Sequence, residues 1–286
     1  MRWRDLKPSE NVRDGRGAGG GRRTRIALSL GVGGGLAAIA LLVAYFLGGP
    51  RTVETLMSGG AGDRDGVAAP SGDERLPLTP GDESSTFVPA ILGSTEDVWS
   101  QLFALSGLHY VNPELTLFDG AVDSACGFAT AAVGPFYCPA DHRIYLDTSF
   151  FADLADRGGP GEFAQAYVIG HEVGHHVQRL LGTADQVRAA QDHGGGNRLQ
   201  VALELQADCY AGVWAHHANW RQRVLEPGDV ERGLAAAEAI GDDRLRRNAG
   251  RRVTPDSFTH GSSEQREHWF GVGLRTGSPQ ACDTFR

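Results

Sequence analysis

The chain is poor in cysteine and has no repeated sequence. Its 286 residues include only four cysteines, and no two of them form a Cys-x-x-Cys pair. A zinc site built from paired thiolates is therefore not expected. No segment recurs at a fixed period, which argues against solenoid and propeller architectures. Any metal site must rely mainly on other side chains.

Basic residues are scarce after residue 51. The sequence has 27 basic and 35 acidic residues; residues 1–51 hold 9 and 3 of them, which leaves 18 and 32, a formal charge of −14, for residues 52–286. So acidic a surface repels the phosphate backbone of nucleic acids. We therefore expect no nucleic-acid partner.

Charge is absent from residues 26–47, a run rich in Leu, Ala, Val and Gly. A helix of about 22 residues crosses a hydrocarbon core of roughly 30 Å. A cleaved signal peptide is the alternative, but it needs a shorter apolar region and a small-x-small cleavage site. Tyr45-Phe46-Leu47 supplies no such site. The run predicts an uncleaved transmembrane helix that contacts the lipid bilayer.

Positive charge predicts the orientation of this anchor. Lysine and arginine are frequent in residues 1–25, whereas only Arg51 closely follows the run. The positive-inside rule assigns the basic side to the cytoplasm. We expect a single-pass protein of the cell membrane with a basic cytoplasmic N-terminus (1–25), an anchor (26–47) and an extracytoplasmic remainder.

The rest of the chain divides into a linker and one domain. Residues 48–85 are dominated by Gly, Pro, Ser, Asp and Glu, as in flexible linkers, and residues 86–286 suffice for one compact domain. The sequence predicts a mainly helical α+β domain with a small sheet. Strand-like runs are at 115–118, 128–133 and 143–147, and helical patterns are at 95–106, 162–181, 198–221, 227–240 and 262–274.

An HExxH motif, formed by His171, Glu172 and His175, lies inside one of these helical patterns. Residues four apart share a helix face, so both imidazoles can reach one cation while Glu172 addresses a water on it. A zinc ion held in this way keeps an open coordination position and lowers the pKa of bound water to roughly 7. The alternative is a helix with two unrelated histidines.

Three options compete for the third zinc ligand. One protease class uses a later histidine in HExxHxxGxxH, but Gln178 and Leu181 occupy the required positions here. A second class uses a glutamate on a later helix with an aspartate four residues on, and Glu204 and Asp208 fit that spacing. The thiolate of Cys209 is the least favoured. We expect Glu204 to complete a His–His–Glu site.

Asp208 is expected beside the metal ligands. Helical spacing puts it on the same face as Glu204, where it can accept a hydrogen bond from the free N–H of His171 and fix the tautomer of that ring. The alternative is an ordinary acidic pair on a solvated helix face.

Several segments resemble a bacterial family, the putative neutral zinc metallopeptidases, which are membrane-anchored relatives of the gluzincin proteases. The resemblance covers most of the chain. It implies a zincin-like fold, a Zn²⁺ cofactor, a protein or peptide substrate and a bacterial membrane location. The segments are MRWRDLKPSENVRD (1–14), GPFYCPADHRIYLDTSFF (134–151), IGHEVGHHVQ (169–178), ELQADCYAG (204–212) and SFTHGSSEQREHWFGVG (257–273).

His260 and Arg266 resemble a pair in membrane-linked gluzincins that include the CAAX prenyl endopeptidases. The resemblance implies that His260 hydrogen-bonds the tetrahedral oxyanion and that Arg266 orients neighbouring carboxylates. In other enzymes, a hydrogen-bond donor to the oxyanion stabilises the transition state by roughly 3–4 kcal/mol. Gly261 departs from the proline of those relatives, which puts the loop conformation in doubt. The alternative is a helix cap in which Ser262 or Ser263 begins a helix.

All four cysteines, Cys126, Cys138, Cys209 and Cys282, follow the predicted anchor. An even number in an oxidising compartment favours two disulfides, although four cysteines allow three pairings. Cys126 with Cys138 would close a short loop. Cys209 with Cys282 would tie the third-ligand helix to the C-terminus.

The combined interpretation is a membrane-anchored zinc metallopeptidase with Glu172 as general base. A catalytically silent zinc protein that binds or assembles partners is one alternative, although a structural site has no use for Glu172. A zinc amidase that acts on cell-wall amides is another, and the sequence barely separates it from a protease. Residues 144–146 form either an edge strand that pairs with substrate or an internal strand.

Overall fold

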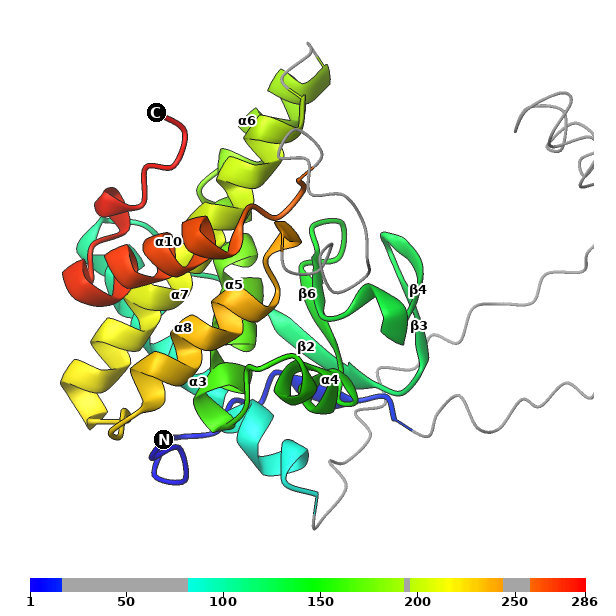
Figure 1. The fold of residues 1–286 in the computed structure, drawn as a ribbon, viewed down its shortest axis with the longest axis vertical. Helices are drawn as coiled ribbons and strands as arrows, with labels where there is room; N and C mark the ends of the chain where they lie inside the picture. Colours follow the sequence, from blue (N-terminus) through cyan, green and yellow to red (C-terminus); the bar gives the residue numbers. More distant parts are fainter. Residues whose placement is uncertain (17–81, 193–195, 244–257) are drawn as a thin grey trace, which may run out of the picture. The chain divides into compact units, whose positions relative to one another are not determined.

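The computed structural model describes residues 1–16, 82–192, 196–243 and 258–286 (Figure 1). All of them belong to one compact unit, made of Met1–Gly19 and Arg75–Arg286. The predicted anchor (26–47) and almost all of the predicted linker (48–85) lie outside the described residues. Within the described part of the chain, no helix combines the length and the apolar character needed to cross a bilayer.

Helices dominate this unit, which confirms the mainly helical α+β class. Four of the five predicted helices begin and end within two residues of their predicted bounds, and the helix predicted at 95–106 is longer because it begins at Ser84. Two short helices had no clear periodic signal. The helices are α3 (Ser84–Leu105), α4 (Phe150–Asp156), α5 (Glu162–Leu180), α6 (Thr183–Asp192), α7 (Gly196–Gln222), α8 (Asp229–Ala239) and α10 (Ser263–Thr276).

A four-stranded sheet lies beside the helices in the order β1-β2-β6-β5 (Figure 1). The strands β1 (Val12–Asp14), β2 (Glu114–Phe118) and β6 (Arg143–Asp147) are parallel, and β5 (Phe136–Cys138) is antiparallel to β6. A separate hairpin consists of β3 (Ala121–Ser124) and β4 (Gly127–Thr130). Since β6 is flanked on both sides, residues 144–146 form an internal strand, and the hypothesis that they pair with substrate is wrong.

Residues 1–16 pack into the domain. Strand β1 pairs with β2, with Val12 opposite Leu115. Trp3 is buried with its ring edge-on to Phe87 of α3, and its indole N–H donates to Glu162 at the start of α5 over 2.7 Å. The N-terminal residues therefore connect the sheet to two helices of the core.

Small residues allow α5, α7 and α10 to approach closely. A Cβ atom at Gly174 would lie 2.8 Å from the backbone oxygen of Ala207, and one at Gly273 would lie 1.9 Å from that of Cys209. Any larger side chain at these positions would force the helices apart. Because Glu204 lies one turn before Ala207, this contact brings its carboxylate to the face of α5 that carries the histidines.

Both expected disulfides are present. Cys126 in the turn of the β3–β4 hairpin bonds to Cys138 at the end of β5, and Cys209 on α7 bonds to Cys282 near the C-terminus, just after the short 3-10 helix η4 (Pro279–Ala281). The second bond fixes the last residues of the chain against the helix that carries Glu204.

Candidate metal centre

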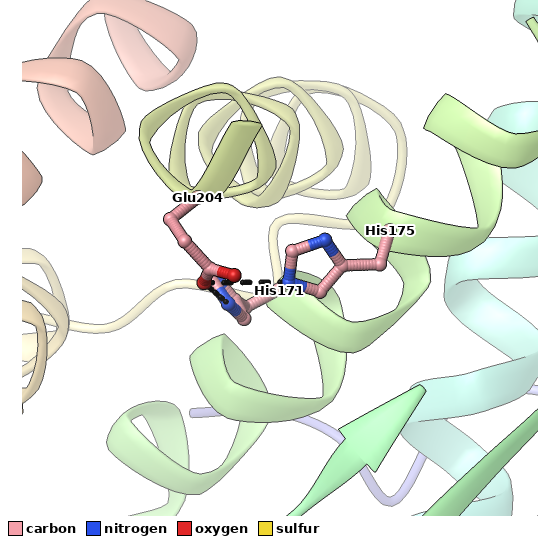
Figure 2. Close-up of side chains that lie close together, drawn as sticks. All are labelled: His171, His175 and Glu204. Carbon is pink, nitrogen blue, oxygen red and sulfur yellow. Dashed lines mark ion pairs between the residues drawn. The ribbon is translucent and has the colours of Figure 1, made fainter. Parts of the chain in front are cut away.

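Three side chains from two helices converge on one point (Figure 2). His171 and His175 lie one turn apart on α5, with ring centroids 4.7 Å apart. Glu204 reaches them from α7: its Oε2 lies 3.3 Å from Nε2 of His171 and 3.4 Å from Nε2 of His175. The three groups are the only cluster of potential metal ligands among the described residues.

This cluster fits a zinc ion. Zinc bonds of roughly 2.0–2.1 Å to nitrogen and oxygen put the ligands of a tetrahedral ion roughly 3.3 Å apart, and the two distances from Glu204 match that separation. Two imidazoles and one carboxylate are also a donor set of catalytic zinc sites, in which the fourth position stays open. The cofactor that the cluster supports is Zn²⁺.

The electrostatics of the cluster attract a positive charge. Burial would lower the pKa of His171, but the carboxylates of Asp208 and Glu204 outweigh it and raise the pKa to about 10. Burial would also lower the pKa of His175, but the carboxylate of Glu204 outweighs it and raises that pKa. Burial would raise the pKa of Glu204, whereas the two imidazoles hold it well below its usual value. A bound cation takes the place of the protons that this arrangement attracts.

His171 is held by a buried, charged network. Its Nδ1 lies 2.8 Å from Oδ1 of Asp208, so that an N–H there leaves Nε2 free to face Glu204. Arg266 donates two parallel hydrogen bonds to Asp208, of 2.9 and 2.8 Å. The hydroxyl of Tyr167 donates to Asp208 over 2.5 Å and accepts from Arg266 over 3.2 Å.

Asp208 and Arg266 thus lie where the sequence analysis expected them, beside His171 and beside a carboxylate. Burial would raise the pKa of Asp208, but Arg266 and His171 keep it below its usual range. Tyr167 had not been assigned to this network. Its position one helical turn before His171, on the same face of α5, is the signal that could have identified it.

His175 is held by neutral groups instead. Its Nδ1 lies 2.9 Å from Oε1 of Gln178, one turn further along α5. The amide nitrogen of Gln178 donates to the backbone carbonyl of Leu203 over 2.6 Å and to Oε1 of Gln206 over 3.2 Å. In the sequence, Gln178 is notable only because it occupies the glycine position of HExxHxxGxxH, and that motif does not predict this contact.

His260 lines the same cavity as the metal ligands. Its side chain is 50% exposed, and its Nδ1 lies 3.5 Å from Asp242 and 2.9 Å from the hydroxyl of Thr259. Asp242 also accepts hydrogen bonds from the backbone N–H groups of Thr259, His260 and Gly261. Gly261 has a φ of 90°, which proline cannot adopt. A proline at this position would therefore require a different loop conformation.

The alternative for this segment, a helix cap, is also present. Ser262 caps α10: its hydroxyl accepts from the backbone of Gln265, and the side chain of Gln265 accepts from the backbone of Ser262. The cap fixes where α10 begins and so where Arg266 enters the core.

The metal cluster and Glu172 line an open cavity of about 530 Å³. Glu172 is 7% exposed, and it borders the cavity together with both histidines. Strand β5, at the edge of the sheet, and the neighbouring 3-10 helix η2 (Ala131–Val133) form part of the wall. A cavity of this size lies within the volume range of ligand-binding pockets. Its apolar lining includes Val133, Phe136, Phe150, Val168 and Val187.

His176, the neighbour of His175, belongs to the core. Its ring nitrogens lie 2.6 Å from the carbonyl of Val111 and 3.1 Å from the hydroxyl of Tyr137, and burial lowers its pKa to about 4. It faces away from the cluster, as its position on the helix predicts.

Comparison with known proteins supports the same chemistry. A family described as "Putative neutral zinc metallopeptidase" has a model that matches residues 1–285. The chain is 45% identical over 293 residues to the uncharacterized protein YpfJ of Escherichia coli K12, covering 100% of this chain and 99% of YpfJ. It is 46% identical over 209 residues to the uncharacterized protein Rv2575 of Mycobacterium tuberculosis, covering 69% of each. No solved structure matches.

Proposed function

Since the chain belongs to the putative neutral zinc metallopeptidase family, we propose that it is a zinc-dependent peptidase that hydrolyses peptide bonds in proteins or peptides. The observation that carries this proposal is the convergence of His171, His175 and Glu204, with ligand separations that suit a tetrahedral zinc ion, beside a cavity that Glu172 also lines.

Glu172 is the proposed general base. It follows His171 on α5 and borders the cavity, so it takes the proton of the attacking water and then delivers it to the leaving amine. Zinc, when bound, polarises the scissile carbonyl and lowers the pKa of water to roughly 7. The attacking water and the scissile carbonyl must both reach the metal cluster, and the cavity gives them access.

His260 is the proposed donor to the oxyanion. Asp242 accepts from its backbone N–H and lies 3.5 Å from its Nδ1, and its half-exposed ring lines the cavity, so its Nε2 is the atom proposed to donate to a substrate. Arg266 has a different task. Its guanidinium is buried and engaged by Asp208 and Tyr167, so we propose that it holds Asp208, which in turn holds His171.

The test measures zinc content and peptide cleavage by the full chain and its Glu172→Gln variant. We expect about one zinc per chain in both proteins, cleavage of a mixed peptide library by the wild type, and a loss of at least about 10²-fold in the variant. Glu231→Gln, which changes an exposed residue on α8, is the control and should cleave normally.

Cell-wall fragments are offered to the same proteins in parallel. Cleavage of their amide bonds, with no cleavage of peptides in the library, would replace the peptidase by an amidase. A zinc-loaded wild type that cleaves neither substrate would contradict the proposal and leave a binding or assembly role.

A further inference from the structure

We infer that Gln178 is a positioning residue for His175, and that Gln206 and the backbone carbonyl of Cys282 hold Gln178 in its working orientation. The inference rests on the metal centre of the proposed function. It concerns how that centre keeps its second histidine in the tautomer that can bind a metal.

The orientation of the Gln178 amide follows from its neighbours. Its Nε2 lies 2.6 Å from the carbonyl oxygen of Leu203, which can only accept a hydrogen bond. The NH₂ group must therefore face Leu203, and Oε1 must face His175. Because Oε1 also only accepts, the hydrogen of the imidazole must sit on Nδ1 of His175. Nε2 then faces the cluster, 3.4 Å from Glu204, and its lone pair is offered to a metal once the ring is neutral.

The orientation of the Gln206 amide, one residue further from the metal cluster than Gln178, is also fixed by its neighbours. Its Nε2 lies 3.0 Å from the carbonyl oxygen of Cys282, so its NH₂ group faces the C-terminal segment. Its Oε1 consequently faces Gln178 and accepts the second N–H of that amide over 3.2 Å. Both amides are buried, so water does not compete for these donors.

The two carbonyls that set this chain of amides are themselves fixed. Leu203 precedes the ligand Glu204 on α7, so the helix that supplies the third ligand also sets the tautomer of the second. Cys282 is bonded to Cys209 on the same helix. The amide chain therefore depends on α7 being docked against α5, and the metal site is complete only when that docking has occurred.

The test uses Gln178→Met, which keeps the volume of the side chain and removes the acceptor. Zinc affinity is measured by competition with a chelator, and we expect a loss of about 10- to 100-fold. Gln206→Met should give a smaller loss, because Gln178 keeps its bond to Leu203. Gln101→Met, an exposed glutamine of α3, is the control and should bind zinc as the wild type does.

A second measurement separates positioning from a general loss of structure. In the zinc-loaded protein, long-range proton–nitrogen spectra should show slowly exchanging Nδ1 protons on both His171 and His175. In Gln178→Met only the proton of His175 should exchange quickly with water, because Asp208 still holds that of His171. Unchanged zinc affinity with a protected His175 proton would overturn the inference, even if the wild type is an active peptidase. A wild type without zinc would instead overturn the proposed function.

A separate observation concerns the placement of the chain relative to a membrane. From the contacts of residues 1–16, we infer that these residues and the peptidase domain lie on the same side of any bilayer to which the chain is attached. Strand β1 is hydrogen-bonded to β2 inside the sheet of the domain, with Asp14 opposite Leu117. A hydrocarbon core of roughly 30 Å cannot separate two strands of one sheet.

Ion pairs reinforce this placement. Arg16 forms an ion pair with Asp82, just before α3. Arg13 pairs with Glu114 of β2 over 2.7 Å. Two of the arginines that predict a cytoplasmic N-terminus, Arg13 and Arg16, thus form ion pairs with the domain. These contacts argue against an orientation in which residues 1–16 and the domain lie on opposite sides.

The test compares two single-cysteine reporters in the full chain, because all four natural cysteines are in disulfides. Glu10→Cys lies in the N-terminal segment and Gln101→Cys lies on α3; both positions are exposed. A membrane-impermeant maleimide is added either to intact cells or to lysed cells. We expect both cysteines to react in the same condition. Reaction of Gln101→Cys in intact cells, with Glu10→Cys protected until lysis, would overturn the inference.

Discussion

The two histidines of the cluster lie one turn apart on α5, yet opposite kinds of chemistry hold them. His171 rests on the buried ions Asp208 and Arg266, whereas His175 rests on the neutral amides of Gln178 and Gln206. Removing one partner of a buried ion pair is costly, but an amide hydrogen bond contributes only about 1 kcal/mol. We therefore expect the His171 side to decide whether the domain is stable and the His175 side to tune how tightly it binds metal.

The largest effect is expected from Asp208→Ala, which leaves the guanidinium of Arg266 buried without its carboxylate. The free energy of unfolding should fall by about 3–5 kcal/mol, measured by urea denaturation of the metal-free chain. The double variant Asp208→Asn with Arg266→Met removes both charges and should recover part of that loss. If the free energy of unfolding of Asp208→Ala lies within about 1 kcal/mol of the wild-type value, the buried ion pair does not stabilise the domain as expected.

A pH series tests the same comparison without a mutation. In the metal-free chain the folded pKa of His171 is raised to about 10 and that of His175 is also raised. The folded state therefore binds protons more tightly than the unfolded chain. Its extra stability is complete below the ordinary histidine pKa of about 6.5 and is lost as the pH rises toward 10, by up to a few kcal/mol.

Zinc binding should follow the opposite trend over the same interval, because the metal competes with those protons. Urea unfolding with a chelator and zinc titrations without it measure the two trends. Gln178→Met should leave the slope of stability against pH nearly unchanged, since the amide carries no charge. A metal-free stability that does not fall between pH 6.5 and 10 would contradict the assignment of charge to this cluster.

The bond between Cys209 and Cys282 closes a long loop, and it reaches the His175 side through the carbonyl of Cys282, which accepts a hydrogen bond from Gln206. Replacing both cysteines by alanine should lower the free energy of unfolding by about 2–4 kcal/mol, measured by denaturation. Zinc affinity should fall as well, because the carbonyl that orients Gln206 loses its anchor. Replacing Cys126 and Cys138 together is the matched control, and zinc affinity should then stay closer to the wild type. If both double cysteine replacements lower zinc affinity equally, the proposed link between the Cys209–Cys282 bond and the orientation of Gln206 is wrong.

The smallest effect is expected from Tyr167→Phe. The change removes one hydroxyl that donates to Asp208 and accepts from Arg266, while the bidentate ion pair remains. A loss of about 1 kcal/mol in the free energy of unfolding is expected, with a modest fall in zinc affinity because Asp208 still orients His171. A loss as large as that of Asp208→Ala would show that the hydroxyl, rather than the ion pair, holds the network.

Much of the helical framework was accessible from sequence, because apolar periodicity and caps act over a few residues. The bounds of α5, α7 and α10 follow from such patterns, and Ser262 caps α10 as its spacing with Gln265 allows. The sequence also located strand β6 correctly, but it left open whether this strand is at the edge or in the interior of the sheet, since strand order depends on distant segments.

The N-terminal residues show what local patterns leave out. Counting basic residues in 1–25 treats every arginine as free charge, whereas Arg13 pairs with Glu114 and Arg16 pairs with Asp82. Trp3 and Val12 are too few to produce a periodic apolar signal, although both are buried. A strand of three residues that pairs with one about a hundred residues later leaves no mark in its own sequence.

The amino-acid sequence alone determined the reactive groups of this protein. The spacing of His171, Glu172 and His175 fixes two imidazoles on one helix face, and the spacing of Glu204 and Asp208 does the same on another helix, because helix geometry depends only on neighbours along the chain. Only the tertiary structure decided what supports each ring. The contacts of Tyr167, Gln178, Gln206 and Arg266 join distant segments, and they exist because small residues let three helices pack closely together.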